Sequence, residues 1–203
     1  MSDLEAQFGA IDIYLFDQLL RGRIAPGATV LDAGCGNGRN LVHLMRAGYN
    51  VCAADPDERA IGAVRKMAAQ LAPALPAENF RAEPVEAMTF ADGSAGSVVC
   101  IAVLHFARDD AQFDAMLRGA WRALAPGGVF FCRLASSIGI EDRVRRIEGR
   151  RCALPDGTER YLADEGLLLS LTRELGGALL DPIKTTLVQN KRAMTTWVVL
   201  KHA

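Results

Sequence analysis

A short apolar run that leads into three alternating glycines constrains this chain more than any other feature. Residues 30–33 are Val-Leu-Asp-Ala, and the sequence Gly-Cys-Gly-Asn-Gly follows directly at 34–38. Glycine adopts the positive φ angles of tight turns and lets another group approach the main chain closely. The pattern predicts a buried strand, a glycine turn and the start of a helix, an arrangement that builds a ligand crevice at the edge of an α/β sheet.

Two acidic residues end neighbouring predicted strands. Asp32 lies next to the glycine turn, and Asp55 follows the apolar run over residues 51–54. Carboxylates accept hydrogen bonds and attract cations, so this pair suits a ligand that carries both a cation and a vicinal diol. The dinucleotide fingerprint fits less well, because Arg39 takes the place of its third glycine and Asp32 would repel a pyrophosphate. A nicotinamide dehydrogenase is therefore disfavoured.

Residues 30–40 together with Asp55 resemble the cofactor motif of the class I S-adenosylmethionine (SAM) methyltransferases. The Pro-Gly-Gly turn at 126–128 is similar to a recurrent turn of that superfamily, and residues 36–40 and 48–51 resemble its tellurite-resistance branch. The resemblance covers about residues 28–203. It implies SAM as the cofactor and S-adenosylhomocysteine as its product.

The order of the predicted elements indicates the fold class. Strand and helix patterns alternate from residue 29 to residue 134, which implies right-handed crossovers and a mostly parallel sheet. Two further strands over 183–189 and 194–201 predict an antiparallel hairpin. This order resembles the seven-stranded methyltransferase fold, so we expect an α/β protein with a Rossmann-like, mostly parallel sheet, a C-terminal hairpin and three α/β/α layers.

The pattern contains no linker and no internal repeat, so we expect a single domain over residues 1–203. Residues 1–27 would form an N-terminal helical cap, because apolar residues recur at helical spacing over 5–22. Residues 137–162 are rich in charge and would be a variable insertion on the substrate side. Pairs such as Glu141 with Arg145 favour a solvated helix there over an anion site.

The resemblance assigns roles to residues around the glycine turn. Gly34 and Gly36 would line the methionine part of SAM, and Asp32 would lie near its amine. Asp55 would accept both ribose hydroxyls, and Pro56 would pack beside the adenine.

The rest of the expected cofactor site is more dispersed. Cys35 in the turn and Asn40 in the helix after it would also contact the cofactor. Val85 and Glu86 would lie at the edge of the adenine, and Ala102 with residues 103–105 would form the floor of the pocket. Many relatives carry an acid shortly after the third strand. Here the corresponding residue is Pro84, and Glu83 or Glu86 could replace the acid.

Three residues are candidates for the acceptor side. His105 could act as a base or orient the acceptor, although packing is the commoner role for a lone histidine. Arg133 interrupts a buried strand, so it would hold either an anionic substrate or a structural carboxylate. Tyr14 could be a lid over the pocket or a core residue. No catalytic side chain is required, since an activated methyl group can be transferred by orientation and water exclusion alone.

Composition and charge narrow the possible partners. Half of the 203 residues are hydrophobic, and the formal net charge of −1 argues against a nucleic-acid or anionic-membrane surface. No apolar run approaches the roughly 20 residues that cross a bilayer, and the acidic N-terminus lacks a signal-peptide pattern. The five scattered cysteines suit reduced core residues and predict no metal site. We expect a cytoplasmic enzyme that methylates a small molecule; the alternative is a SAM-binding regulatory or partner module without catalysis.

Overall fold

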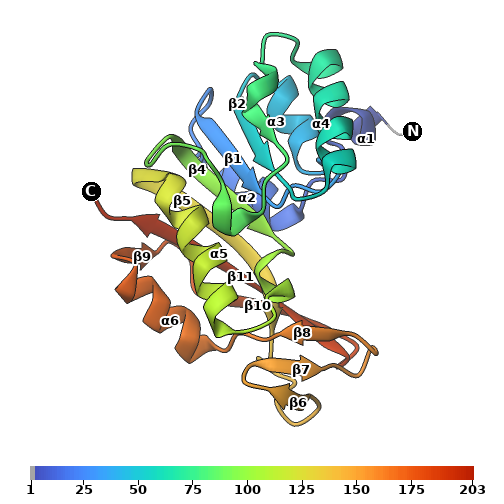
Figure 1. Cartoon of the computed structure of the whole chain (residues 1–203), viewed down its shortest axis with the longest axis vertical. Helices are drawn as coiled ribbons and strands as arrows, with labels where there is room; N and C mark the ends of the chain where they lie inside the picture. Colours follow the sequence, from blue (N-terminus) through green and yellow to red (C-terminus); the bar gives the residue numbers. More distant parts are fainter. Residues whose placement is uncertain (1–2) are drawn as a thin grey trace.

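The computed structural model describes residues 3–203, and its centre is an eight-stranded sheet (Figure 1). Its strands are β1 (Thr29–Ala33), β2 (Asn50–Ala54), β3 (Phe80–Arg81), β4 (Ala95–Ile101), β5 (Leu124–Ser136), β9 (Gly177–Leu179), β10 (Lys184–Val188) and β11 (Arg192–Lys201). The order is β10-β11-β5-β4-β1-β2-β3, and β9 pairs with β11 outside this path. Strands β1 to β5 run parallel, and β11 is antiparallel to β5, β9 and β10. The predicted parallel sheet with a C-terminal hairpin is confirmed, and β9 is an addition that the sequence did not indicate.

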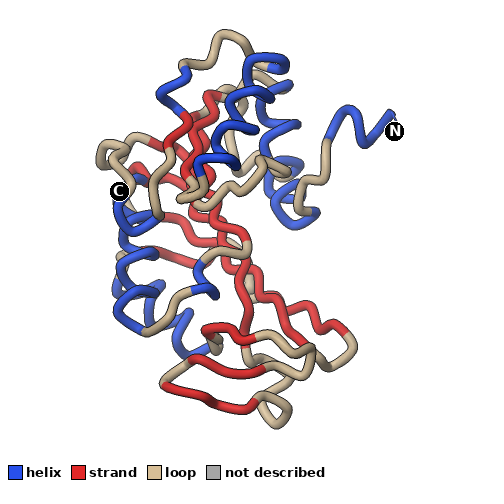
Figure 2. Tube along the Cα trace, turned by 45° about the vertical axis from the view of Figure 1, so that its right-hand side comes forward, coloured by secondary structure: helices blue, strands red, loops and turns tan. Residues whose placement is uncertain are grey.

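Helices cover both faces of this sheet (Figures 1 and 2). They are α1 (Asp3–Phe8), α2 (Ile13–Leu20), α3 (Leu41–Arg46), α4 (Glu58–Leu71), α5 (Asp110–Ala123) and α6 (Glu165–Glu174), with short 3₁₀ turns η1 (Ala77–Asn79), η2 (Val85–Ala87) and η3 (Leu104–Phe106). Successive side chains of a strand point to opposite faces. Phe130 therefore joins the core under α5 and α6, whereas Phe131 joins the core under α2, α3 and α4. The three α/β/α layers are confirmed.

The N-terminal cap differs from the single helix predicted over residues 5–22. The described part of this segment forms two helices, because Gly9 takes a φ of +65° and Asp12 begins a new helix. The Asp12 carboxylate accepts a hydrogen bond from the backbone N–H of Tyr14 at 3.0 Å, which caps α2. The break leaves Asp12, at the start of α2, beside Asn40, whose side chain accepts a hydrogen bond from the Asp12 amide.

The charged insertion is a small antiparallel sheet rather than a solvated helix, so that prediction is wrong. Strands β6 (Arg145–Glu148), β7 (Arg151–Ala153) and β8 (Glu159–Tyr161) pair in the order β6-β7-β8. The ion pairs of this region join Arg150 to Asp164 at 2.6 Å and Arg151 to Glu159 at 3.0 Å, instead of residues 141 and 145. Charged residues that are spaced for one face of a helix also fit alternate positions of a strand. Here the pairing of strands across turns determines that the segment is a sheet.

Two further findings concern the chain as a whole. Across residues 3–203, no helix has the length and apolar character needed to pass through a bilayer. All five cysteines are buried free thiols.

Candidate functional site

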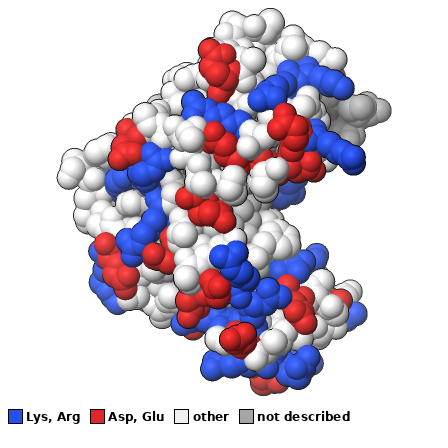
Figure 3. Space-filling view, in the orientation of Figure 1, with Lys and Arg blue, Asp and Glu red and all other residues white. Residues whose placement is uncertain are grey.

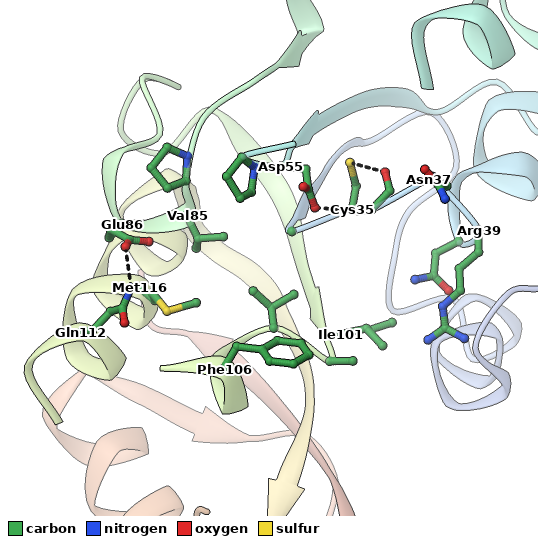
Figure 4. A pocket seen from close by; sticks show the side chains of 17 residues that line it. Cys35, Asn37, Arg39, Asp55, Val85, Glu86, Ile101, Phe106, Gln112 and Met116 are labelled. Atoms are coloured by element: carbon green, nitrogen blue, oxygen red, sulfur yellow. Dashed lines mark hydrogen bonds between the residues drawn. The ribbon is translucent and has the colours of Figure 1, made fainter. Parts of the chain in front are cut away.

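A cavity of about 920 Å³ lies at the carboxyl ends of β1, β2 and β4 (Figure 4). Its walls come from the glycine turn, from the residues that follow β2, from η2, from the end of β4 and from α5. Ligand pockets in proteins usually measure roughly 300–1,000 Å³, so this space suits a ligand of cofactor size. It stands where ligands bind in open α/β sheets.

The glycine turn forms one wall and depends on backbone freedom at Gly34. This residue has a φ of +86°, and a Cβ atom there would collide with the side chain of Val103 beyond β4. The amides of Gly34 and Cys35 both donate to the carbonyl of Ala54, at 2.8 and 3.0 Å. The turn is thus fixed to the end of β2 and packed against the chain that follows β4.

Asp55 stands at the edge of the same wall with its carboxylate held by the backbone. One oxygen accepts from the amide of Gly36 at 2.8 Å and the other from the amide of Asp57 at 3.0 Å. A carboxylate offers about four acceptor positions. Two remain for a ligand in the cavity, in an orientation that the two amides fix.

Asp32 behaves differently from Asp55. It is 1% exposed, it does not line the cavity, and its Oδ2 finds no hydrogen-bond partner within the described part of the chain. Burial raises the pKa of Asp32 from 3.8 to about 7, with Asp55 raising it further and Arg39 opposing the shift. An orphaned buried carboxyl of this kind favours a cation in its neighbourhood.

The opposite wall joins η2 to α5. Gly119 of α5 approaches η2 so closely that a Cβ atom would collide with the carbonyl of Val85. Glu86 accepts a hydrogen bond from the side-chain amide of Gln112 at 2.9 Å, as Figure 4 shows. Glu83 instead accepts from the amide and hydroxyl of Thr89, at 2.8 and 2.6 Å, and does not line the cavity. Of the two acids considered from the sequence, Glu86 is therefore the one that this wall presents.

The floor of the cavity consists of residues at and after the end of β4. Ile101, Ala102, Val103 and Phe106 line it. Ala102 has a φ of +60°, a conformation that alanine rarely adopts, and a hydrogen bond of 2.8 Å from its amide to the carbonyl of Arg133 holds it there. Strained residues of this sort concentrate at functional sites.

His105 does not line the cavity. It is 5% exposed, its Nδ1 accepts a hydrogen bond from the amide of Ala135 at 3.0 Å, and its ring packs against Phe106. Burial lowers its pKa to about 4, helped by the charge of Arg160. Since the lone pair that a base would need is already occupied, the geometry favours the packing role.

Arg133 and Tyr14 also lie outside the cavity lining, next to its floor. A guanidinium nitrogen of Arg133 donates to Asp12 at 2.6 Å, so the structural carboxylate considered for this arginine exists. The Arg133 guanidinium stacks over the Tyr14 ring at 4.7 Å. The amide of Asp12 donates to the side chain of Asn40 at 3.0 Å, which ties this group to the cavity wall.

Sequence reasoning placed most of the glycine wall but missed part of the cavity. Nine of the ten expected cofactor residues line it, the exception being Asp32. The lining residues that were not among the expected ones are Asn37, Arg39, Pro84, Ile101, Phe106, Gln112 and Met116. Of the residues expected at the floor, Ala102 and Val103 line the cavity, whereas Leu104 and His105 do not. One available signal was the Asp109–Gln112 capping pattern, which starts α5 at this edge of the sheet and so brings Gln112 and Met116 there.

Comparison with known proteins agrees with this architecture. A family model described as a methyltransferase domain matches residues 31–132, just over half of the chain. An uncharacterized methyltransferase of Synechocystis sp. is 30% identical over 107 residues, which are 53% of this chain and 47% of that protein. The ubiquinone biosynthesis O-methyltransferase of Methylocella silvestris is 32% identical over 117 residues, 56% of this chain and 43% of that protein. The chain therefore spans about half the length of the curated relatives that it matches.

Among solved structures, the 1,6-didemethyltoxoflavin-N1-methyltransferase of Burkholderia thailandensis, with bound 1,6-didemethyltoxoflavin and S-adenosylhomocysteine, has the same fold. The TM-score is 0.72 at 20% identity, over 99% of this chain and 82% of that one. The matched domain, the strand order and the glycine turn lead to one conclusion: this chain belongs to the methyltransferase domain family, within the class I SAM-dependent methyltransferases.

Proposed function

We propose that this chain binds SAM in the 920 Å³ cavity and transfers its methyl group to a small-molecule acceptor by in-line displacement, with S-adenosylhomocysteine as the product. The observation that carries the proposal is the Asp55 carboxylate. Two backbone amides fix it at the cavity edge, and its two remaining acceptor positions match the vicinal hydroxyls of a ribose.

The other walls fit the remaining parts of SAM. Glu86 and Gln112 offer a polar edge for the adenine, and the side chains of Pro56, Val85 and Met116 offer apolar contact for its faces. The main chain at Gly34 and Gly36, with Cys35 and Asn40 beside it, would hold the methionine part. The orphaned carboxyl of Asp32 would favour the positive charge of the amine or the sulfonium.

Bound SAM supplies a methyl group on a sulfonium, which is already an activated leaving group. The chain then contributes orientation and the exclusion of water. Ile101, Val103 and Phe106 give the cavity an apolar floor suited to that role. Because His105 has its Nδ1 lone pair occupied, we infer that the acceptor attacks with a lone pair that it already carries, without a histidine base.

A small acceptor fits the charge and size of the surface around the site. Acidic and basic side chains are interspersed on the face that Figure 3 shows, and the molecule is hollowed on one side between its N-terminal helices and the β6-β7-β8 sheet. Mixed charge of this kind does not favour a nucleic acid. The 1,6-didemethyltoxoflavin-N1-methyltransferase of the same fold was crystallised with bound 1,6-didemethyltoxoflavin.

Calorimetry with SAM tests the proposal, with Asp55→Ala as the variant and Asp142→Asn, an exposed carboxylate, as the matched control. Wild type and D142N should bind SAM, and D55A should bind it at least about tenfold more weakly because two charge-assisted hydrogen bonds are lost. Mass spectrometry for S-adenosylhomocysteine over a panel of small acceptors then tests catalysis. SAM binding without any product would favour the non-catalytic module, and no SAM binding at millimolar concentration would contradict the proposal altogether.

A further inference from the structure

A row of polar side chains crosses the sheet next to the cavity floor. In the strand register, Ile101 of β4 is paired with Arg133 of β5, Arg133 with Thr196 of β11, and Thr196 with Lys184 of β10. Directly paired residues of neighbouring strands point to the same face of a sheet. Ile101 lines the cavity, so the row runs outward from the cavity floor across three strands.

Two members of this row have polar atoms that are buried and unpartnered. Within residues 3–203, neither the Nε of Arg133 nor the hydroxyl oxygen of Thr196 has a hydrogen-bond partner. Buried polar groups are nearly always satisfied, and each exception needs an explanation. Two donors orphaned at adjacent positions of one row indicate a ligand that accepts from both.

The surroundings of the row indicate the charge of that ligand. Arg133 is paired with Asp12, whereas Lys184 is exposed and makes no ion pair with a described residue. The Tyr14 ring lies over the Arg133 guanidinium at 4.7 Å and within 5.6 Å of the Lys184 ammonium nitrogen, and its hydroxyl bonds that of Thr186 at 2.8 Å. Arg133 and Lys184 carry two positive charges and Asp12 carries one negative charge, so one positive charge remains unbalanced beside the two unpartnered donors.

We propose that Arg133, Thr196 and Lys184 form a subsite for a carboxylate on the methyl acceptor. The Nε–H of Arg133 and the hydroxyl of Thr196 donate to the carboxylate oxygens, and Lys184 supplies the balancing charge. Two neighbouring donors and a single excess charge match a singly charged, two-oxygen group. The rest of the acceptor extends along the row toward Ile101 and Phe106 at the cavity. This assignment of an acid as the substrate class rests on the proposed function.

The test compares an acid with its neutral isostere. Binding of 4-hydroxybenzoate and of 4-hydroxybenzamide is measured by calorimetry or NMR on the protein saturated with S-adenosylhomocysteine and on the unliganded protein. Wild type should prefer the acid by about tenfold or more. Lys184→Met and Thr196→Val should each remove most of that preference and leave SAM affinity unchanged. Lys191→Met, at the exposed turn between β10 and β11, is the matched control and should keep it.

The outcomes separate this inference from the proposed function. Three results would overturn the carboxylate subsite. They are equal binding of the acid and the amide, no binding of the acid at millimolar concentration, and a preference for the acid that K184M and T196V both retain. Weaker SAM binding in K184M would also overturn it, because the row would then serve the carboxylate of the cofactor. Failure of wild type to bind SAM would instead contradict the proposed function, while the unliganded protein still reports whether the acid is preferred.

Discussion

Replacing Asp32 with asparagine probes the buried carboxyl beside the glycine turn. Burial raises the pKa of Asp32 from 3.8 to about 7, so the folded protein keeps this proton up to about pH 7 whereas the unfolded chain releases it near 3.8. Between these values the folded state binds more protons than the unfolded state. This group therefore makes the wild-type protein less stable as the pH rises from about 4 to about 7, and the loss is complete above that window.

The size of the effect follows from the two pKa values. Their difference corresponds to about 4 kcal/mol in the free energy of unfolding. D32N does not titrate there, but its side-chain amide takes the place of an unpartnered carboxyl oxygen, at a cost of about 1–3 kcal/mol that does not change with pH. The stability of wild type minus that of D32N should therefore fall by about 4 kcal/mol between about pH 4 and pH 8.

Urea unfolding of the unliganded proteins at several pH values measures this difference. The variant D142N, at an exposed carboxylate, controls for the loss of one acidic group. If wild type minus D32N stays flat, or rises with pH, then Asp32 does not carry the proton that its burial implies, and the reasoning about an orphaned carboxyl is refuted.

Three further predictions rest on the same region. The affinity for SAM should rise as the pH passes through about 7 in wild type, because ionised Asp32 attracts the cationic ligand; calorimetry of D32N should show no such rise. Gly34→Ala should lower the free energy of unfolding by about 1–2 kcal/mol or more, because a φ of +86° is unfavourable for alanine and the new Cβ collides with Val103. Adding Val103→Ala should recover the part of this loss that comes from the collision, but not the part that comes from the backbone conformation. Arg133→Met should cost about 3–5 kcal/mol by leaving Asp12 buried without its partner, and unfolding of the double variant with Asp12→Asn should show a smaller loss.

Local signals in the sequence predicted the central elements well. The sequence predicts strands over residues 29–33 and 50–54, and β1 and β2 have these bounds, because each is a short apolar run that begins and ends at a turn. The spacing of the sequence also predicts that Asp57, Asp109 and Asp164 begin helices, and each of them accepts a backbone N–H at 2.7 or 2.8 Å. A cap needs only residues within one turn of each other, so its signal is complete in the sequence.

Features that depend on distant pairing were missed. The β6-β7-β8 sheet forms because turns at Gly149 and Gly157 bring strands together, and the same charges fit helical spacing equally well. The break at Gly9 was missed because apolar spacing continues across it. In both segments the spacing of the residues is compatible with more than one structure, and tertiary contacts determine which one forms.

The candidate site likewise contains one part that local sequence signals predict and another part that depends on distant pairing. Its glycine wall and Asp55 lie within or next to one motif, whereas the far wall needs α5 packed against η2 and the polar row needs β10, β11 and β5 in register. Transfer from an activated methyl donor requires only that the acceptor is oriented and that water is excluded. The reaction itself therefore does not determine which side chains surround the acceptor. The motif can therefore identify the donor while leaving the acceptor open. If the row beginning at Arg133 selects the acceptor, then changing Thr196 and Lys184 should alter which molecules are methylated without altering the binding of SAM.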